Sequence, residues 1–312
     1  MTEQNTRDYV GLDIAKCQLD YAITDADQAR IDYTEAEVKQ WIEKLRRLPR
    51  PCVVCEATGG YERRVVQALM AADIEVCLVM PGRVRAFARA EGLLAKTDRI
   101  DARLLRRFGQ KMVPRSYCLA APEVKELRGL LDYRRLVVGQ LAELCSRREV
   151  AVDVLQRLLA SHQKMLEKAL EKTDARIAAH LKKNAELHAK SQRLQEVTSV
   201  GPVLAATMLA HVPELGQLTD KTLSAVIGVA PHPQDSATTS RPRHVRGGRG
   251  IVRRVLYMAA VCAARFNPIL KIFYQRLRAA GKPAKVAIVA VMRKLLCLLN
   301  RLLADPNFVL AG

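Results

Sequence analysis

The chain has 312 residues, a length that favours about two domains, each with room for a hydrophobic core. Hydrophobic residues make up 49% of it and aromatic residues only 4%, which indicates helices packed through aliphatic side chains. The formal net charge of +19 at pH 7 predicts a polyanionic partner, most simply nucleic acid. A generic basic surface is the alternative. Against it, residues 236–312 hold fifteen lysines and arginines and one acid, Asp305.

The eight cysteines do not predict a metal site. Cys52 and Cys55 form a C-x-x-C pattern in an apolar run, but neither a second such pair nor a nearby histidine pair completes a zinc site. We expect these two, and six cysteines scattered through other apolar stretches, to be buried free thiols in a reducing cytosol. The six are Cys17, Cys77, Cys118, Cys145, Cys262 and Cys297.

No segment predicts a membrane span. Residues 1–8 are polar and contain no signal-peptide core. The most apolar C-terminal stretch, 286–303, includes Arg293, Lys294 and Arg301, which favours a core helix. We therefore expect a cytoplasmic protein with no membrane partner.

Up to about residue 110 the sequence alternates between strand and helix patterns. One apolar run ends near Asp13, and another leads into Glu56. Pro49 and the Pro81-Gly82 pair end two of the segments. Strands that alternate with helices predict an α/β sheet with helices on its faces. The expected strands are 9–14, 19–23, 52–55 and 75–80, and the expected helices are 35–48 and 61–72.

The character changes between residues 122 and 197. Leucines recur at helical spacing among arginines and glutamates, and no proline follows Pro122. This pattern predicts one or two long helices that form a coiled-coil arm. Because the heptads are imperfect, an ordinary helical bundle is the alternative.

The third region begins near Val197. A turn containing Gly201 and Pro202 precedes a helix of small residues, as in helix-hairpin-helix proteins that bind DNA phosphates through backbone N–H groups. A plain helix start explains the same pattern. Farther on, a helix over 218–229, a polar loop over 230–240 and helices from Val252 onward are expected.

Four acidic side chains stand where chemistry is often found. Asp13 and Glu56 end strands, and α/β sheets tend to place functional groups at strand ends. Asp98 and Asp101 are three residues apart at the start of a helix, so their carboxylates share one face. Four carboxylates brought together suit Mg²⁺, or Mn²⁺ in its place, and two such ions promote phosphodiester chemistry. For the helical pair, capping and interaction with the helix dipole are the structural alternative.

Arginines crowd the stretch 241–254, which contains glycines but no acid. Arginine forks match phosphate oxygens bidentately, and glycines let the backbone approach a ligand closely. Such contacts give affinity with little sequence information. A solvated basic turn is the alternative. The six expected phosphate-binding residues are Arg241, Arg243, Arg246, Arg249, Arg253 and Arg254.

The acidic segments carry a family resemblance. Residues 10–16, 55–61 and 96–102 resemble the DEDD transposases of bacterial insertion sequences. Residues 200–202, 228–231, 235–236 and 246–256 resemble the C-terminal transposase domain of the same family. The resemblance covers nearly the whole chain, and the ordered set of motifs is more specific than any one of them.

This resemblance implies a fold and a mechanism. The N-terminal domain would be RuvC-like, of the ribonuclease-H type. Family members are recombinases guided by a structured non-coding RNA, the bridge RNA, which pairs with donor and target DNA. A serine of the C-terminal domain attacks a DNA phosphate and becomes covalently linked, beside Mg²⁺ held by the RuvC-like carboxylates. Carried over to this sequence, the metal-binding catalytic acids are Asp13, Glu56, Asp98 and Asp101, and the nucleophile is Ser236.

The serine loop departs from the family pattern at one position. Ala237 follows Ser236, where the family usually has glycine, and Ser240, next to Arg241, is therefore the alternative nucleophile. A serine hydroxyl needs a base or a metal to activate it. His232 and His244 flank the loop, but no acid is positioned to pair with either histidine. We therefore expect the bound metal to activate the serine.

The sequence therefore predicts an α/β plus all-α protein. We expect a RuvC-like catalytic domain over 1–115, a helical coiled-coil arm over 116–195 and a basic transposase domain over 196–312. The expected partners are donor and target DNA, the guide RNA and further copies of the chain in a dimer or tetramer. The arm would suit an active site shared between protomers, and the protein would be associated with the nucleoid.

Two other functions fit some of these features. A RuvC-like nuclease, such as a junction resolvase, would need the four acids and water as nucleophile, without a serine. A basic architectural nucleic-acid binder would need only the arginines. Variants of Ser236 separate the first from a recombinase, and variants of Asp13 and Glu56 separate the second.

Overall fold

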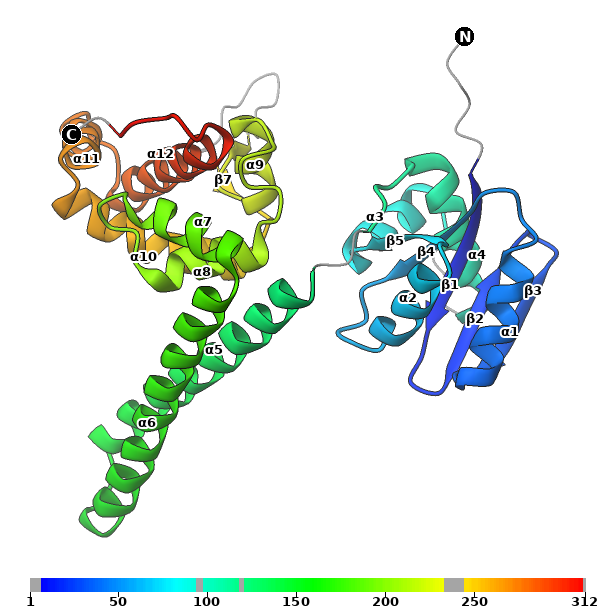
Figure 1. Cartoon of the computed structure of the whole chain (residues 1–312), viewed down its shortest axis with the longest axis horizontal. Coiled ribbons are helices and arrows are strands. Elements are labelled where there is room, and N and C mark those ends of the chain that lie inside the picture. Colours follow the sequence, from blue (N-terminus) through cyan, green and yellow to red (C-terminus); the bar gives the residue numbers. More distant parts are fainter. Residues whose placement is uncertain (1–6, 94–97, 118–120, 233–243, 311–312) are drawn as a thin grey trace. The chain divides into compact units, whose positions relative to one another are not determined.

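The computed structural model describes residues 7–93, 98–117, 121–232 and 244–310, without the side chains of 98–100, 232 and 244. The chain divides into two compact units (Figure 1). Residues 1–119 form the sheet unit, and residues 120–312 form the helical unit.

The sheet unit is built on five strands in the order β3-β2-β1-β4-β5. The central strand β1 pairs antiparallel with β2 and parallel with β4, and β5 continues the parallel part. β3 is an edge strand, antiparallel to β2. The strands are β1 (Asp8–Ile14), β2 (Gln18–Ala22), β3 (Gln28–Asp32), β4 (Pro51–Glu56) and β5 (Glu75–Val79).

Helices cover both faces of this sheet. α1 (Glu35–Leu45) and α2 (Glu62–Ala71) pack on one face, where Leu12 and Trp41 lie in the core. α3 (Pro81–Ala90) and α4 (Asp98–Met112) pack on the other, around Tyr9 and Phe108. Successive residues of a strand point to opposite faces, so β1 serves both cores.

The helical unit has a core of buried aliphatic side chains. Its helix α8 is buried nearly all round, which explains its run of small and apolar residues. α12 packs against α10 and α11. The elements are α5 (Pro122–Glu149), α6 (Asp153–Lys183), α7 (Ala185–Gln195), α8 (Pro202–His211), α9 (Asp220–Ile227), β6 (Pro231–His232), β7 (His244–Val245), α10 (Gly250–Phe266), α11 (Pro268–Ala279) and α12 (Ala284–Ala304).

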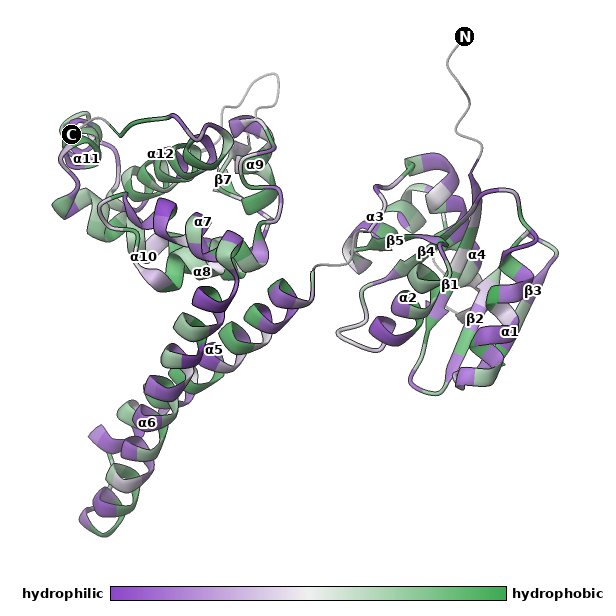
Figure 2. Cartoon of the chain, viewed as in Figure 1, coloured by the Kyte–Doolittle hydropathy of each residue, from purple (hydrophilic) through white to green (hydrophobic). Residues whose placement is uncertain are grey.

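The two longest helices, α5 and α6, form an antiparallel hairpin that belongs to the helical unit (Figure 1). Leu127 near the start of α5 and Leu181 near the end of α6 join the main core of that unit. Farther out, Val137, Leu144 and Leu166 form a small core of their own. Polar and apolar residues alternate along both helices (Figure 2), as expected for an arm with one narrow seam.

Two elements of the sheet unit were not predicted. β3 has no buried residue, since it lies at the sheet edge, and so it lacks the alternating pattern of a half-buried strand. α3 begins with Pro81, from which only the end of a strand is predicted. Proline is favoured at the first helical position, because its missing N–H would have no helical partner there.

The expectation that all cysteines are buried is wrong in part. Cys52, Cys55 and Cys77 are buried free thiols. Three others are exposed, because they lie in the turn after β1 or on outward faces of α5 and α10; they are Cys17, Cys145 and Cys262. Cys297 is partly buried, and Cys118 lies outside the described residues.

The C-terminal apolar stretch forms a core helix, as predicted. Val291, Leu295 and Leu299 of α12 are fully buried. Within the described residues, no single helix is long and apolar enough to cross a membrane; α10 and α11 reach that length and composition only as a pair bent by 91°.

Candidate active site

Asp13 and Glu56 lie on neighbouring parallel strands. The register of β1 and β4 pairs Leu12 with Cys55, and Asp13 and Glu56 are the next residues along the two strands. Both side chains are partly exposed at the carboxyl ends of their strands. Because residues two apart share a face, Asp13 lies on the side of Tyr9 and Gly11, which α4 covers. The register therefore places Asp13 and Glu56 side by side on the sheet face that α4 covers.

Two glycines bring α4 onto this face. A Cβ atom at Gly11 would overlap the carbonyl oxygen of Ala102. A Cβ atom at Gly109 would lie 2.6 Å from Cδ1 of Tyr9 and 2.7 Å from Cγ2 of Val54, closer than real Cβ contacts. The early part of α4 thus lies over Gly11 and the later part over Tyr9, so the helix runs antiparallel to β1. Its first turns reach the strand end that carries Asp13.

Asp98 and Asp101 begin α4, as the sequence predicts. Asp101 immediately precedes Ala102, the residue that contacts Gly11, and is partly exposed. The side chain of Asp98 lies outside the described residues. Among the described side chains, no three histidines, cysteines or carboxylates are grouped closely enough to hold a metal. None of Asp13, Glu56 and Asp101 is without a polar partner.

A further acid, Asp20, stands beside Asp13 and was not predicted. The antiparallel register of β1 and β2 places the two residues directly opposite each other. Asp20 is buried, and its carboxylate accepts hydrogen bonds from Nε and Nη2 of Arg30 at 2.8–3.1 Å. A buried carboxylate is stable only with such a partner. Leu19 and Tyr21 face the α1–α2 core, so the alternation predicts only that Asp20 points to the other face of the sheet. Asp20 is buried there because α4 packs on that face, a contact that the local sequence does not show.

The loop after Glu56 is shaped by another unpredicted acid, Glu62. Its carboxylate accepts hydrogen bonds from the backbone N–H groups of Thr58 (3.1 Å) and Gly60 (2.8 Å) and from the Thr58 hydroxyl (2.8 Å). Burial alone would raise the pKa of Glu62, but these hydrogen bonds outweigh it and hold the pKa below its ordinary value. The Tyr33 hydroxyl donates to the carbonyl of Tyr61 and ties the same loop to the end of β3.

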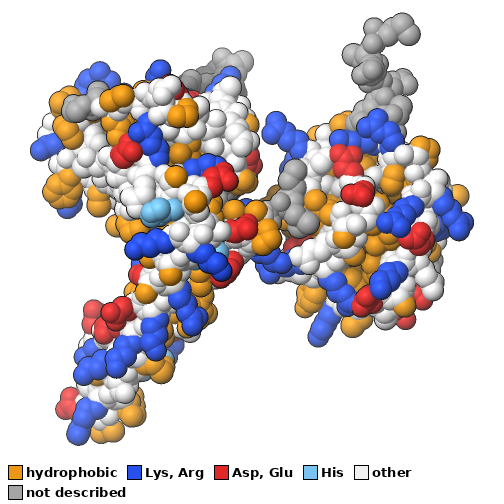
Figure 3. All heavy atoms as spheres, viewed as in Figure 1, with side chains coloured by type: hydrophobic (Ala, Val, Ile, Leu, Met, Phe, Trp, Pro, Cys, Tyr) orange, Lys and Arg blue, Asp and Glu red, His pale blue; other side chains and the backbone are white. Residues whose placement is uncertain are grey.

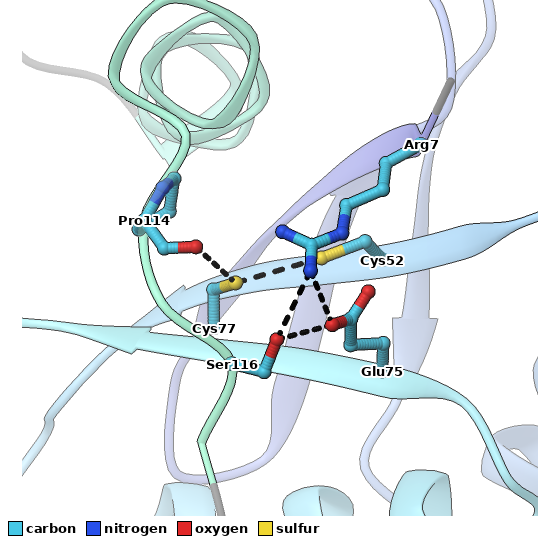
Figure 4. A network of polar contacts seen from close by, with 6 residues as sticks. All are labelled: Arg7, Cys52, Glu75, Cys77, Pro114 and Ser116. Carbon is cyan, nitrogen blue, oxygen red and sulfur yellow. Dashed lines mark hydrogen bonds and ion pairs between the residues drawn. The ribbon is translucent and has the colours of Figure 1, made fainter. Parts of the chain in front are cut away.

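The segment after α4 is anchored to the outer strand β5 (Figure 4). The backbone N–H of Tyr117 donates to the carbonyl of Val76 at 2.6 Å. Glu75 binds Arg7 at 2.7 Å and also accepts from the Ser116 hydroxyl. These contacts fix where the chain leaves the sheet unit.

The thiols beneath this network are structural. Cys52 and Cys77 lie 3.5 Å apart, and Cys77 donates to the carbonyl of Pro114 at 3.3 Å (Figure 4). The hydrogen bond with Cys77, together with burial, keeps the pKa of Cys52 above its ordinary value. Cys52 and Cys55 belong to cores on opposite faces of the sheet, so the C-x-x-C pair cannot bind one metal ion.

In the helical unit, β6 and β7 form the base of a hairpin that encloses residues 233–243. Three residues before β6 and three residues after β7, the chain meets itself at a glycine pair, Gly228 and Gly248. A Cβ atom at Gly248 would overlap the backbone nitrogen of Gly228, and both glycines have positive φ angles, 71° and 79°. Only glycine meets both requirements without strain. Ser236, Ser240, Arg241 and Arg243 lie between the strands and outside the described residues.

Two of the arginines predicted to bind phosphate are engaged within the protein. Arg249 makes a bidentate ion pair with Glu214, with N···O distances of 2.7 and 2.6 Å. Arg253 donates to the carbonyls of Gly247 and Gly228, and so fastens the glycine contact. Tertiary partners of this kind cannot be identified from local sequence. Arg246 and Arg254 are exposed, although Arg246 is not without a partner.

The Gly201 turn joins two packed helices, α7 and α8. Gly201 and Pro202 are exposed at the start of α8. Ser199, just before them, has a φ of 90°, an uncommon conformation for a residue other than glycine. The arrangement has the helices that a helix-hairpin-helix requires, and phosphate binding by the turn stays a prediction.

Two family models match the chain. Residues 10–154 match a DEDD domain of the IS110 type, described as "Transposase", and residues 191–275 match the "Transposase IS116/IS110/IS902 family". The chain is also similar to the pilin gene-inverting proteins of Moraxella lacunata and Moraxella bovis. Each is 25% identical over 303 residues, which cover 93% of this chain and 94% of the relative. An uncharacterized 43.6 kDa protein of insertion element IS110 from Streptomyces coelicolor is 26% identical over 65% of this chain and 48% of its own length.

Proposed function

Because the chain belongs to the IS110/IS116/IS902 family of transposases, we propose that it cuts, exchanges and rejoins DNA strands through a covalent serine–DNA bond. Carboxylates of the sheet unit hold Mg²⁺, and a serine of the β6–β7 hairpin is the nucleophile. A structured RNA from the same element selects the DNA sites. This function goes beyond the family assignment in its metal, its nucleophile and its guide.

The observation that carries the proposal is the pair of acids under α4. β1 and β4 set Asp13 and Glu56 side by side, and the Gly11 contact brings the first turns of α4 over them. Asp98 and Asp101 begin that helix. Acids from three separate elements thus reach one end of the sheet, where α/β proteins bind ligands.

The donor set suits a hard divalent cation. Carboxylate oxygens are the ligands that Mg²⁺ and Mn²⁺ prefer. Asp13, Glu56, Asp98 and Asp101 would hold the ion, and Asp20 stays paired with Arg30 beside them. Bound Mg²⁺ would supply Lewis-acid activation and charge stabilisation at a phosphate. The loop ordered by Glu62 keeps the backbone that follows Glu56 in a fixed conformation.

The serine step exchanges one phosphodiester for another. The Ser236 oxygen bonds to phosphorus as the bond from phosphorus to one deoxyribose oxygen breaks. The serine proton is lost, and the released sugar oxygen gains a proton. Attack by a sugar hydroxyl on the serine-linked phosphate reverses the step and rejoins the strands. Ser240 is the second candidate for the nucleophile.

The basic surface of the helical unit supports binding to nucleic-acid backbones. Lysines and arginines lie along α5 and α6 and over the rest of the unit (Figure 3). Contacts of this kind give affinity that depends on salt but little on sequence. Backbone contacts of this kind leave the choice of DNA site to another component, and base pairing with a guide RNA supplies it in other guided systems.

The deciding experiment is a search for a covalent protein–DNA adduct. The protein is co-expressed with its native flanking DNA, which should encode any guide RNA, and the adduct peptide is mapped by mass spectrometry. We expect DNA on Ser236, lost in Ser236→Ala and in Asp13→Ala. An adduct on Ser240 moves the nucleophile but keeps the mechanism. Cleaved DNA without any adduct contradicts the proposal and supports a hydrolytic RuvC-like nuclease.

A second function, inversion of a DNA segment, is favoured by the Moraxella relatives, whose names assign gene inversion to them. The same strand exchange inverts the DNA between two sites when both sites lie in one molecule in opposite orientation. A plasmid with two copies of the native junction in opposite orientation tests it. Inversion scored by sequencing supports this function, whereas excision or insertion alone contradicts it.

A further inference from the structure

The helical unit contains a cavity of about 780 Å³ that the serine chemistry does not use. The turn between α7 and α8 forms one wall, with α11 and α12 as the others, and C-terminal Phe308 and Leu310 border it. Its floor is apolar, with Leu270, Phe273 and Leu298 among the lining residues. A cavity of this size is within the range of small-ligand sites.

Asn267 lines the cavity where α11 meets the turn before α8. It is buried, its Oδ1 accepts from the backbone N–H of Leu270 at 3.0 Å, and it caps α11. Its Nδ2 donates to the carbonyl of Thr198 at 3.4 Å, in the turn before α8. One side chain thus fixes α11 against that turn, so the two walls are held together in the folded unit.

The charges around the cavity are unequal. Its two carboxylates already have partners: Glu196 binds Arg193 at 2.6 Å, and Asp220 accepts from Asn300 at 3.0 Å. Three exposed cations of α12 line the same cavity and make no ion pair within the described part of the chain. They are Arg293, Lys294 and Arg301. The cavity therefore offers positive charge to a ligand.

Aromatic rings hold two of these cations at the cavity. The Lys294 ammonium lies 4.3 Å from the centre of the Phe273 ring, and the Arg301 guanidinium lies 4.9 Å from that of Phe308. A cation over an aromatic face is attracted by the ring but keeps its full charge. The opposite face of α12 is buried in the core, with Leu295 and Leu299 fully covered, so the helix cannot turn these cations away.

We propose that this cavity binds an unpaired nucleotide of single-stranded nucleic acid. The base enters the apolar floor beside Phe273, and the adjoining phosphates bind Arg293, Lys294 and Arg301. The inference rests on the proposed function only in taking the partner to be a nucleic acid. It adds a second binding place, which no residue of β6 or β7 lines.

The combination of an apolar floor and unpaired cations selects this ligand. Single-strand binding sites combine a positive groove with aromatic side chains on which bases lie. An apolar peptide would leave the three cations without counter-charge. In a duplex the bases are stacked and paired, so a concave pocket can take only a base that has left the stack. RNA loops and displaced DNA strands both present such bases.

Binding is measured by fluorescence anisotropy with single-stranded RNA, single-stranded DNA and duplex DNA of one length, all in EDTA. The test variant is R293A/K294A/R301A. Its control, K164A/K168A/K172A, removes the same charge from exposed positions of α6 that do not line the cavity. We expect the test variant to weaken binding to at least one single strand about tenfold or more and to flatten its salt dependence. Duplex binding should change no more than in the control.

Phe273→Leu tests the aromatic ring, which is proposed to contact the base and also holds Lys294. The substitution keeps an apolar side chain and all three cations, but removes the aromatic face. Salt dependence distinguishes the two roles, because loss of the base contact alone leaves it unchanged. Stacking of a base on an aromatic ring implies a loss of about fivefold or more in single-strand affinity. Comparing RNA with DNA then shows which strand supplies the nucleotide.

Cys297 reports occupancy directly, because its thiol lines the cavity. Alkylation by N-ethylmaleimide is mapped by mass spectrometry, with and without the bound oligonucleotide. We expect protection of Cys297 and unchanged labelling of the exposed Cys145 and Cys262.

A loss that is no more specific to single strands in the test variant than in the control, or an unprotected Cys297 in the complex, would overturn the proposal. These readouts need neither metal nor strand cleavage. The proposal can therefore fail while serine adducts form, and it can hold in an Asp13→Ala variant that forms none.

Discussion

The two units prepare their chemistry in different ways. In the sheet unit, the acids sit on regular elements, and strand register together with close steric fit sets their positions. In the helical unit, Ser236 and Ser240 lie outside the described residues, and the described part is the strand pair β6–β7 on either side of them. Arg253 joins the chain before β6 to the chain after β7, since it binds the carbonyls of Gly247 and Gly228.

This difference teaches where each unit is sensitive. The acidic site depends on strand register and on the close contact between Gly11 and α4, so one added methyl group at Gly11 should displace it. When the contacts at β6 and β7 weaken, the helical core can stay folded, but side chains supported by these strands are positioned less precisely. The single tryptophan, Trp41, is buried in the sheet unit, so its fluorescence follows that unit alone.

The largest effect is expected from neutralising the acids. Asp13→Asn and Glu56→Gln should each lower the rate of strand cleavage about a hundredfold or more, because metal binding supplies several kcal/mol to such reactions. Asp32→Asn removes an exposed acid at the end of β3 and should leave the rate unchanged. The measurement is single-turnover cleavage, with circular dichroism to verify the fold. Full activity in Asp13→Asn would mean that the carboxylates of the sheet unit are not needed for strand cleavage.

The next-largest effect is expected from adding a methyl group under α4, at Gly11. Gly11→Ala places a Cβ atom on the carbonyl oxygen of Ala102, a backbone atom that can move only with the helix. We expect a loss of about 3 kcal/mol in the unfolding free energy of the sheet unit, measured by Trp41 fluorescence in urea. Gly82→Ala, which meets nothing within 4 Å, is the matched control and should change little. Equal stability of the two variants would mean that α4 is not held as described.

The corresponding change in the helical unit is Gly248→Ala. It combines a positive φ with overlap on the backbone nitrogen of Gly228, at a local cost of about 1–3 kcal/mol. Trp41 fluorescence should report no change, whereas serine-adduct yield should fall about tenfold. Hydrogen exchange should increase in β6 and β7. Gly250→Ala, with open space around it, is the control. A sharp fall in sheet-unit stability would contradict the separation of the two responses.

The sequence was sufficient for the parts of the site that depend on local patterns. The apolar runs that end at Asp13 and Glu56 are β1 and β4, and the helix that begins at Asp98 is α4. Their convergence follows from register and from Gly11, whose contact with Ala102 joins distant parts of the chain. No local pattern distinguishes such a glycine from one in a flexible turn.

The arginines illustrate the same limit in the other unit. Six in one stretch suggested six phosphate contacts, yet Arg249 and Arg253 have partners inside the protein. Glu214, the partner of Arg249, follows α8 and is remote in sequence. A guanidinium fits a carboxylate as well as a phosphate, so residue type alone cannot decide between them.

The Arg249–Glu214 ion pair should produce the smallest effect, one that depends on pH. The hydrogen bonds from Arg249 hold the pKa of Glu214 below its ordinary value despite partial burial. A lowered pKa in the folded state means that the pair stabilises the helical unit above the unfolded pKa, about 4.3, and that this contribution is lost as pH falls through the folded pKa. Since both side chains are about one third exposed, we expect only about 0.5–1 kcal/mol.

Glu214→Gln tests this contribution, with hydrogen exchange in the first turn of α10 as the readout. Arg249 precedes that turn, so loss of the ion pair should loosen it at pH 6 and make little further difference near pH 3. Glu186→Gln is the control, because Glu186 also has a lowered pKa beside Lys190, but that pair is more exposed and lies on α7. A difference between wild type and Glu214→Gln that persists at pH 3 would mean that packing, not charge, holds Arg249. The expected outcome, a contribution of only about 0.5–1 kcal/mol, would let Arg249 exchange the Glu214 carboxylate for a DNA phosphate at little cost.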